Sequence, residues 1–110
     1  MASKSSSRPS AARVRELRGR MDRLNLELLA LIEQRVQLAV RIGRAKQSLG
    51  LPAVDPKRER EMRARLLKSA SGSLSPAELE RVFRAILAAS RRAVVRDRRG
   101  AGVKPRARRE

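Results

Sequence analysis

The feature that most constrains this chain is a long run of apolar side chains spaced alternately by three and four residues. The run extends from Arg13 to Leu49 without a proline and contains Val14, Leu17, Met21, Leu24, Leu28, Leu31, Leu38, Ile42, Ala45 and Leu49. This heptad spacing is typical of a helix that packs an apolar stripe against another helix. At about 1.5 Å per residue such a helix measures roughly 55 Å, whereas a compact domain of this size has a radius of gyration of only about 13 Å. The sequence therefore predicts one long helix that needs a partner along its exposed end.

One position in this stripe carries a charge where an apolar residue is expected. Arg35 occupies it, and a guanidinium in an apolar interface is costly unless an anion meets it. Lys46 follows eleven residues later, and eleven helical steps return to within roughly 20° of the starting direction. The two cations therefore share a face, with Ala39 and Ile42 between them as an apolar floor. Lys46 taken alone would fit a solvated surface charge, but together the four residues predict a pocket for an anionic, partly apolar ligand.

Composition excludes several kinds of chemistry. The 110 residues include no cysteine and no histidine, so disulfides, thiolate nucleophiles, imidazole catalysis and the usual transition-metal ligands are absent. Aromatic residues make up 1% of the chain, which leaves Leu, Ile, Val, Ala and Met to build a core between helices. We expect an all-α protein with no metal site and no cofactor, whose chemistry depends on charges and hydrogen bonds.

Helix start and stop signals divide the rest of the chain. Gly50 to Pro52 ends the long helix, and Asp55 before Pro56 has the pattern of an N-cap with proline at the first helical position, which predicts a short helix at about 56–69. Ser75 and Glu78 form a capping box that starts a third, medium helix, ending near Arg96. We expect residues 1–10 to be a disordered tail, 11–97 a helical domain and 98–110 a disordered basic tail.

The formal charge of +17 indicates attraction to anions. One interpretation is a basic helical dimer that binds nucleic acid, for which affinity would fall steeply with salt. Against it, such a dimer has no use for Arg35 on the apolar stripe, and the chain lacks aromatic side chains on which bases could stack. The first ten residues contain no apolar run typical of a secretory signal, so a cytoplasmic location without membrane contact is expected.

An ordered set of residues resembles the all-helical, type II chorismate mutases over roughly residues 14–95. The set consists of Leu17-Arg18, Leu28-Leu29-Ala30-Leu31, Arg35, Leu38-Ala39, Ile42-Gly43, Lys46, Pro52, Asp55, Arg58-Glu59, Phe83, Ile86 and Ser90. The resemblance implies an intertwined homodimer of three-helix chains with two equivalent pockets. It also implies an isomerase of aromatic amino acid biosynthesis that converts the dianion chorismate to prephenate by a Claisen rearrangement. That reaction needs restraint of the substrate and charge stabilisation, but no cofactor.

The resemblance also implies roles for particular side chains. Arg18 of the neighbouring chain and Arg35 would bind the enolpyruvyl carboxylate, and Lys46 would reach that carboxylate and the ether oxygen. Arg58 and Ser90 would serve the ring carboxylate. By the same resemblance, the ring hydroxyl would be met by Asp55 and Glu59. Catalysis would then depend on Arg35 and Lys46.

Val94 departs from the family pattern. Four residues after Ser90, the family usually has a Gln or Glu that hydrogen-bonds the ether oxygen. Losing one preorganised donor can cost about 10² to 10³ in rate. Lys46 could then act alone at a lower rate, the substrate could be the 4-amino analogue of chorismate, or the mutase could work when docked to another shikimate-pathway enzyme. A non-catalytic regulatory paralogue that still binds the ligand is a further alternative.

Overall fold

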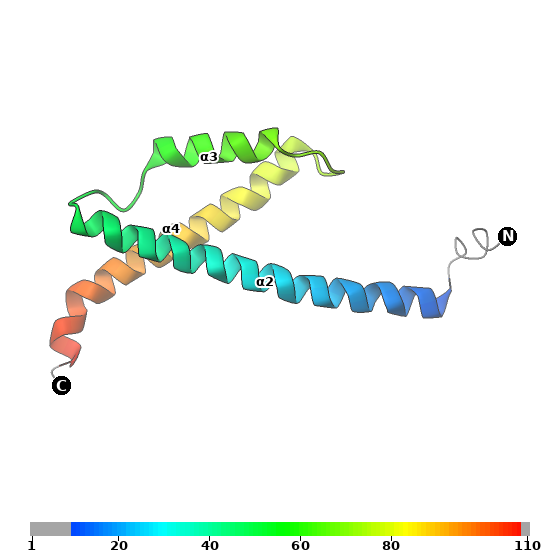
Figure 1. Ribbon diagram of the computed structural model, residues 1–110, viewed down its shortest axis with the longest axis horizontal. Coiled ribbons are helices and arrows are strands. Elements are labelled where there is room, and N and C mark those ends of the chain that lie inside the picture. The colour runs from blue at the N-terminus through cyan, green and yellow to red at the C-terminus, as the bar shows by residue number, and fades with distance from the viewer. Residues whose placement is uncertain (1–9, 109–110) are drawn as a thin grey trace. The chain divides into compact units, whose positions relative to one another are not determined.

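Three helices make up the part of the chain that is described by the computed structural model, residues 10–108, with side chains for 10–100. They are α2 (Ala11–Ser48), α3 (Pro56–Lys68) and α4 (Pro76–Arg108), and residues 10–108 contain no strand (Figure 1). The predicted all-α class, with a long first helix, is confirmed. The contacts divide the chain into two units, residues 1–33 and 34–110, so that α2 contributes to both.

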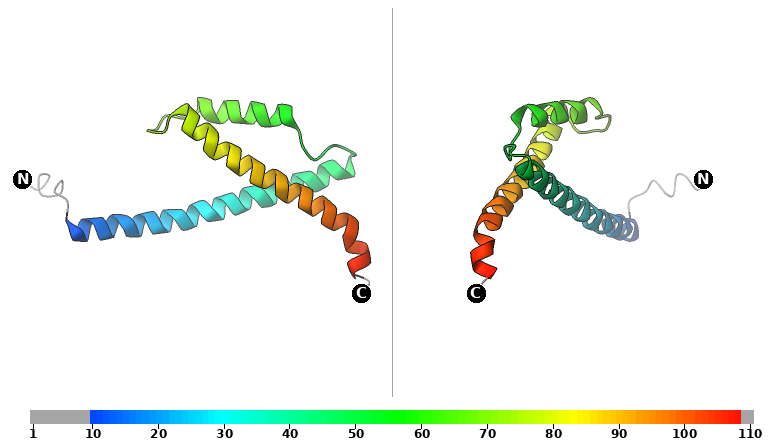
Figure 2. Two further views of the ribbon diagram at one scale, coloured as in Figure 1. Left: turned by 180° about the vertical axis from the view of Figure 1, so that it is seen from behind. Right: turned by 60° about the vertical axis from the view of Figure 1, so that its left-hand side comes forward.

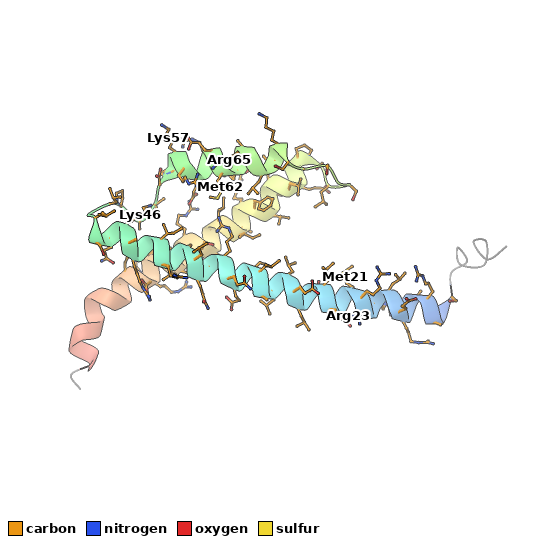
Figure 3. The ribbon with its side chains drawn as sticks, in the orientation of Figure 1. Met21, Arg23, Lys46, Lys57, Met62 and Arg65 are labelled. Atoms are coloured by element: carbon orange, nitrogen blue, oxygen red, sulfur yellow. The ribbon has the colours of Figure 1, made fainter. Side chains whose placement is uncertain are left out.

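The first unit contains the N-terminal part of α2. Ser10 caps this helix, because its hydroxyl accepts a hydrogen bond from the backbone N–H of Arg13 at 3.0 Å. Ser10 is therefore an N-cap rather than the last residue of a tail, and the rest of the predicted tail lies outside the described residues. The heptad side chains in this unit are exposed; Met21, for example, is 56% exposed and stands out from the helix (Figure 3). The single chain thus leaves the N-terminal stripe of α2 uncovered.

The end of α2 has the geometry that its sequence predicts. Gly50 adopts a left-handed backbone with φ +73°, which costs glycine little because it has no Cβ. The backbone N–H of Gly50 donates to the carbonyl of Gln47, and that of Leu51 donates to the carbonyl of Lys46 at 2.8 Å. These two bonds form a Schellman motif, which satisfies the last carbonyls of the helix.

Both later helices begin with the predicted caps. The Asp55 side chain accepts from the backbone N–H of Arg58 at 3.1 Å, ahead of Pro56. Ser75 and Glu78 bond reciprocally: the Ser75 N–H donates to the Glu78 carboxylate at 2.8 Å, and the Glu78 N–H donates to the Ser75 hydroxyl at 3.1 Å. The Ser75 N–H, and secondarily its hydroxyl, lowers the pKa of Glu78. This contribution to stability is therefore present above the ordinary pKa and lost as the pH falls through the lowered one.

The core of the second unit lies where the middle of α4 crosses the C-terminal part of α2 (Figure 2). Leu87, Ser90, Ala93 and Val94 of α4 are buried, and Gly43 is the buried residue of α2. Gly43 matters for the crossing because a Cβ at this position would lie 2.6 Å from Val94 Cγ1. The two helices can approach this closely only because residue 43 has no side chain.

Helix α4 is longer than predicted. The sequence analysis ended it near Arg96 and assigned 98–110 to a disordered tail, but the helix continues to Arg108. The glycines at 100 and 102 weaken a helix by about 1 kcal/mol each without ending it. Two side chains just after the expected end, Asp97 and Arg98, also bond to α2 and the segment that follows it. Across the described residues, no helix is long and apolar enough to cross a membrane.

Replacing the α4 cap tests the origin of this helix. Ser75→Ala removes the hydroxyl acceptor, and we expect it to lower the free energy of unfolding by about 0.5–2 kcal/mol. Urea unfolding at fixed protein concentration measures the change. Ser71→Ala, in the exposed loop before the cap, is the matched control and should change stability little. Equal effects of the two substitutions would contradict the role of the cap.

Candidate functional site

A pocket of about 380 Å³ opens among α2, α3 and α4 within the second unit. Its volume is in the range of small-molecule sites. The lining residues are Arg35, Leu38, Ala39, Ile42, Gly43, Lys46, Ala53, Asp55, Arg58, Glu59, Met62, Leu87, Ser90, Arg91 and Val94. Every predicted site residue except Arg18 is among them. The face that carries Arg35, Ala39, Ile42 and Lys46 on α2 therefore lines a pocket, as the helical spacing predicted.

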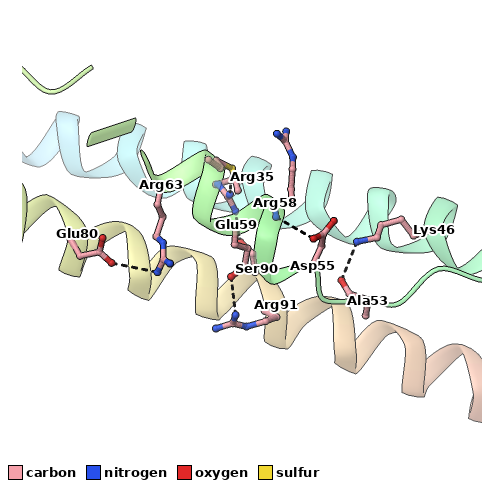
Figure 4. Close-up of polar contacts among 11 residues, drawn as sticks. Arg35, Lys46, Ala53, Asp55, Arg58, Glu59, Arg63, Glu80, Ser90 and Arg91 are labelled. Carbon is pink, nitrogen blue, oxygen red and sulfur yellow. Dashed lines mark hydrogen bonds and ion pairs between the residues drawn. The ribbon is translucent and has the colours of Figure 1, made fainter. Parts of the chain in front are cut away.

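Arg35 joins all three helices at this pocket. Its Nη1 donates to the Ser90 hydroxyl at 2.8 Å, and its Nη2 lies 3.4 Å from the Met62 sulfur (Figure 4). A guanidinium has five N–H donors, so these two contacts leave others for a ligand. Within residues 10–100, no carboxylate lies at ion-pair distance from Arg35. The anion that the sequence demands is thus not supplied by the chain's own described acidic residues.

Lys46 and Arg58 stand at the opposite end of the pocket from Met62. The Lys46 ammonium donates to the carbonyl of Ala53 at 3.4 Å, a long hydrogen bond that a ligand could replace (Figure 4). Asp55 accepts from the Arg58 backbone, while the Arg58 side chain is exposed. Neither cation pairs with a carboxylate in the described part of the chain.

Glu59 has a partner that sequence analysis missed. Arg91 of α4 donates to the Glu59 carboxylate at 2.9 Å, and the Glu59 side chain is 22% exposed. Both residues line the pocket. Thirty-two positions separate them in the sequence, so no local pattern could have paired them.

The charges around the pocket favour a dianion. Four cationic residues and two carboxylates line it, which leaves a formal excess of two positive charges. One carboxylate, Glu59, is already paired with Arg91, and the other, Asp55, caps α3. The remaining cations, Arg35, Lys46 and Arg58, surround the apolar floor. No group of side chains that could hold a metal ion occurs in the described residues.

Val94 forms an apolar part of the wall between α2 and α4. It is 7% exposed and packs against Gly43, so no donor is presented at the position where the family usually has Gln or Glu. Arg91 lines the pocket nearby but is bonded to Glu59. The departure that the sequence showed at residue 94 therefore lies in the pocket itself.

Two arginine contacts fasten α4 to the end of α2. Arg44 bonds the Asp97 carboxylate with two nitrogens, at 2.8 and 3.1 Å, and this hydrogen bonding together with the opposite charge raises the pKa of Arg44. Arg98 Nη2 donates to the carbonyls of Gly43 and Leu51 at 3.0 and 3.1 Å. Because Leu51 leads to Ala53, these bonds help to place the carbonyl that holds Lys46.

Arg18 belongs to the first unit and is exposed on α2. The pocket of the second unit is lined by residues between 35 and 94. The role of Arg18 in a neighbouring chain's pocket thus stays a prediction.

Comparison with known proteins agrees with this geometry. The family model for type II chorismate mutases matches residues 17–94, which include every lining residue of the pocket. The chain belongs to the type II chorismate mutase family. The resemblance that the sequence suggested is therefore confirmed, and it favours a mutase over the nucleic-acid-binding alternative.

Solved structures and curated proteins give the same relationship. Two crystal forms of the chorismate mutase from Thermus thermophilus are each 41% identical and match 71% of this chain, with TM-scores of 0.68 and 0.69. The match covers 89% and 98% of those chains. A bifunctional chorismate mutase/prephenate dehydratase from Aquifex aeolicus is 39% identical over 80 residues, and the T-protein of Haemophilus influenzae is 35% identical over 72. The matched region spans only 22% and 19% of these two proteins.

The Gly43–Val94 contact gives a prediction of unusual sign. Alanine normally stabilises a helix interior by about 0.5–1 kcal/mol relative to glycine. Gly43→Ala should instead destabilise by about 1–3 kcal/mol through overpacking against Val94. Thermal or urea unfolding measures the difference.

Two further variants test the cause. Val94→Ala should remove most of the penalty of Gly43→Ala, because the clashing methyl is gone. Gly100→Ala, within α4 and with open space around residue 100, should show the usual stabilisation. Destabilisation by Gly43→Ala that persists in the Val94→Ala background would show that the contact is not responsible.

Proposed function

We propose that this chain is a chorismate mutase, an isomerase that converts chorismate to prephenate. The observation that carries the proposal is the set of three cations, Arg35, Lys46 and Arg58, that line one pocket without a carboxylate partner among residues 10–100. A substrate with two carboxylates and an apolar ring matches the excess charge and the apolar floor. Membership of the family supports this choice over other dianions.

The reaction is an intramolecular rearrangement in which a C–C bond forms while the ether C–O bond breaks. No proton, electron or group leaves the substrate, so no general base, nucleophile or cofactor is required. The protein must hold the enolpyruvyl arm over the ring and stabilise the charge that separates at the breaking bond. Planar arginine forks suit the first task because they bind carboxylates with two parallel hydrogen bonds.

Each lining residue has a role under this proposal. Arg35 binds the enolpyruvyl carboxylate, and its bonds to Ser90 and Met62 hold the guanidinium in place. Lys46 leaves the Ala53 carbonyl and donates to the ether oxygen, where negative charge develops. Arg58 receives the ring carboxylate. The ring hydroxyl donates to Glu59, whose carboxylate is oriented by Arg91.

The buried Val94 side chain bears on rate and specificity. With no hydrogen-bond donor at residue 94, stabilisation of the ether oxygen falls to Lys46. We therefore expect a functional but slower mutase. The 4-amino analogue of chorismate is the second candidate substrate, because it has the same two carboxylates and the same ether bond.

We infer that the working form is a homodimer. The exposed heptad side chains of α2, from Val14 to Leu31, supply an apolar stripe of the kind that two long helices bury together. The family resemblance assigns Arg18 of one chain to the pocket of the other. Each pocket would then contain arginines from both chains.

Val94→Gln tests the missing donor. If residue 94 faces the breaking bond, this substitution should raise kcat on chorismate, by up to about 10²- to 10³-fold. Steady-state loss of chorismate absorbance measures the rate, and 4-amino-4-deoxychorismate is assayed in parallel. Val82→Gln, at an exposed position of the same helix, is the control and should leave the rate unchanged. An unchanged rate on both substrates with Val94→Gln would contradict this placement of residue 94.

Complementation tests the shared pocket. Arg18→Ala and Arg35→Ala should each lose most activity, since each removes a carboxylate ligand. When the two variants are unfolded and refolded together in equal amounts, about a quarter of wild-type activity should return, because half of the dimers contain one intact pocket. The control mixture of Arg35→Ala with Lys46→Ala should recover nothing, because both residues belong to the same chain's pocket. Recovery no greater than the sum of the single variants would contradict the shared site.

A further inference from the structure

A second pocket, of about 260 Å³, lies between α3 and α4 and has no role in the proposed reaction. Four arginines line it: Arg60 and Arg63 on α3, and Arg84 and Arg91 on α4. Glu59 is the acidic residue among its lining side chains. We call this cavity the arginine pocket.

The ion pairs of the arginine pocket leave its cations only partly compensated. Arg63 and Arg84 share a single carboxylate, that of Glu80, at 3.4 and 3.0 Å (Figure 4 shows the Arg63 pair). Arg91 pairs with Glu59 at 2.9 Å. In the described part of the chain, Arg60 has no carboxylate at ion-pair distance. Four guanidinium groups therefore face two carboxylates, an excess of two positive charges in one cavity.

Several features distinguish this cavity from an ordinary solvated basic surface. The Arg63 side chain is only 26% exposed, so part of its charge has been withdrawn from water. Holding α3 against α4 would need one of these ion pairs, yet two arginines converge on the same acidic residue. An arginine fork that shares its carboxylate keeps N–H donors free for another acceptor. The volume is several times the roughly 30 Å³ that one water molecule occupies in the liquid.

We propose that the arginine pocket binds a small polyvalent oxyanion, with phosphate or carboxylate groups received by Arg63 and Arg84. Guanidinium groups bind both kinds of group bidentately, which a lysine cannot do. Glu59 and Arg91 also line the substrate pocket, so the two cavities share part of one wall. The proposal concerns binding alone and does not depend on the proposed mutase activity.

Calorimetry with inorganic pyrophosphate, and separately with citrate, tests the proposal at a constant ionic strength set with sodium chloride. We expect saturable binding of one anion per chain. The double variant Arg63→Gln/Arg84→Gln should weaken binding by about tenfold or more, since it removes charge-assisted hydrogen bonds worth about 1.5–3 kcal/mol each. Tighter binding of pyrophosphate would assign the site to phosphates, and tighter binding of citrate would assign it to carboxylates.

Two controls separate this site from the general charge of the protein and from the substrate pocket. Arg92→Gln/Arg96→Gln removes the same charge from exposed positions of α4 and should change affinity less than twofold. Arg35→Ala should leave pyrophosphate binding intact. Equal weakening by the two double variants, loss of binding in Arg35→Ala, or no saturable binding of either anion would each overturn the proposal.

The pocket variant could also disturb the packing of α3 on α4, so the wild-type protein provides an independent measurement. Pyrophosphate should shift the backbone amide NMR signals around Arg60, Arg63 and Arg84. Signals around Ala39 and Ile42, in the substrate pocket, should move less. Larger shifts at Ala39 and Ile42 would overturn the assignment.

Discussion

The hydrogen bond from Arg35 to Ser90 is the contact on which the second unit depends most. It joins α2 to α4 inside a part-buried site, and the same guanidinium reaches Met62 of α3. An isolated charge at this depth would destabilise the fold, so its neighbours must supply polar acceptors. Ser90, which is 4% exposed, does so as a neutral group and leaves the positive charge uncompensated. The interaction that assembles the three helices thus also creates the attraction for an anionic ligand.

Close approach of α2 and α4 brings these groups together. Gly43 lets Val94 lie against the α2 backbone, and that crossing places Lys46 and Arg35 opposite the same stretch of α4. Family members that carry a polar residue at 94 would place a donor where this chain places methyl groups. The same packing position therefore affects both the helix crossing and the chemistry of the pocket, so a change at residue 94 cannot alter one alone.

The sequence predicted most of the fold because its signals are local. Heptad spacing, the Asp55 cap and the Ser75–Glu78 capping box each depend on residues within one or two helical turns, and each is present in the structure. Arg35 was recognisable because a charge interrupts an apolar stripe. The Glu59–Arg91 pair and the Arg98 contacts were missed because they join positions more than thirty residues apart. The length of α4 was missed because glycine weakens a helix without ending it.

The Arg44–Asp97 and Arg98 contacts separate two boundaries that usually coincide. The last residue that lines the substrate pocket is Val94, which is also where the match to the family ends. Two of the links that hold α4 to the end of α2 come from the next four residues. A chain shortened to the family domain would keep every ligand-facing side chain and lose these anchors. Its pocket would be complete in composition but less rigid, so the outer turn of α4 contributes to preorganisation without touching the ligand.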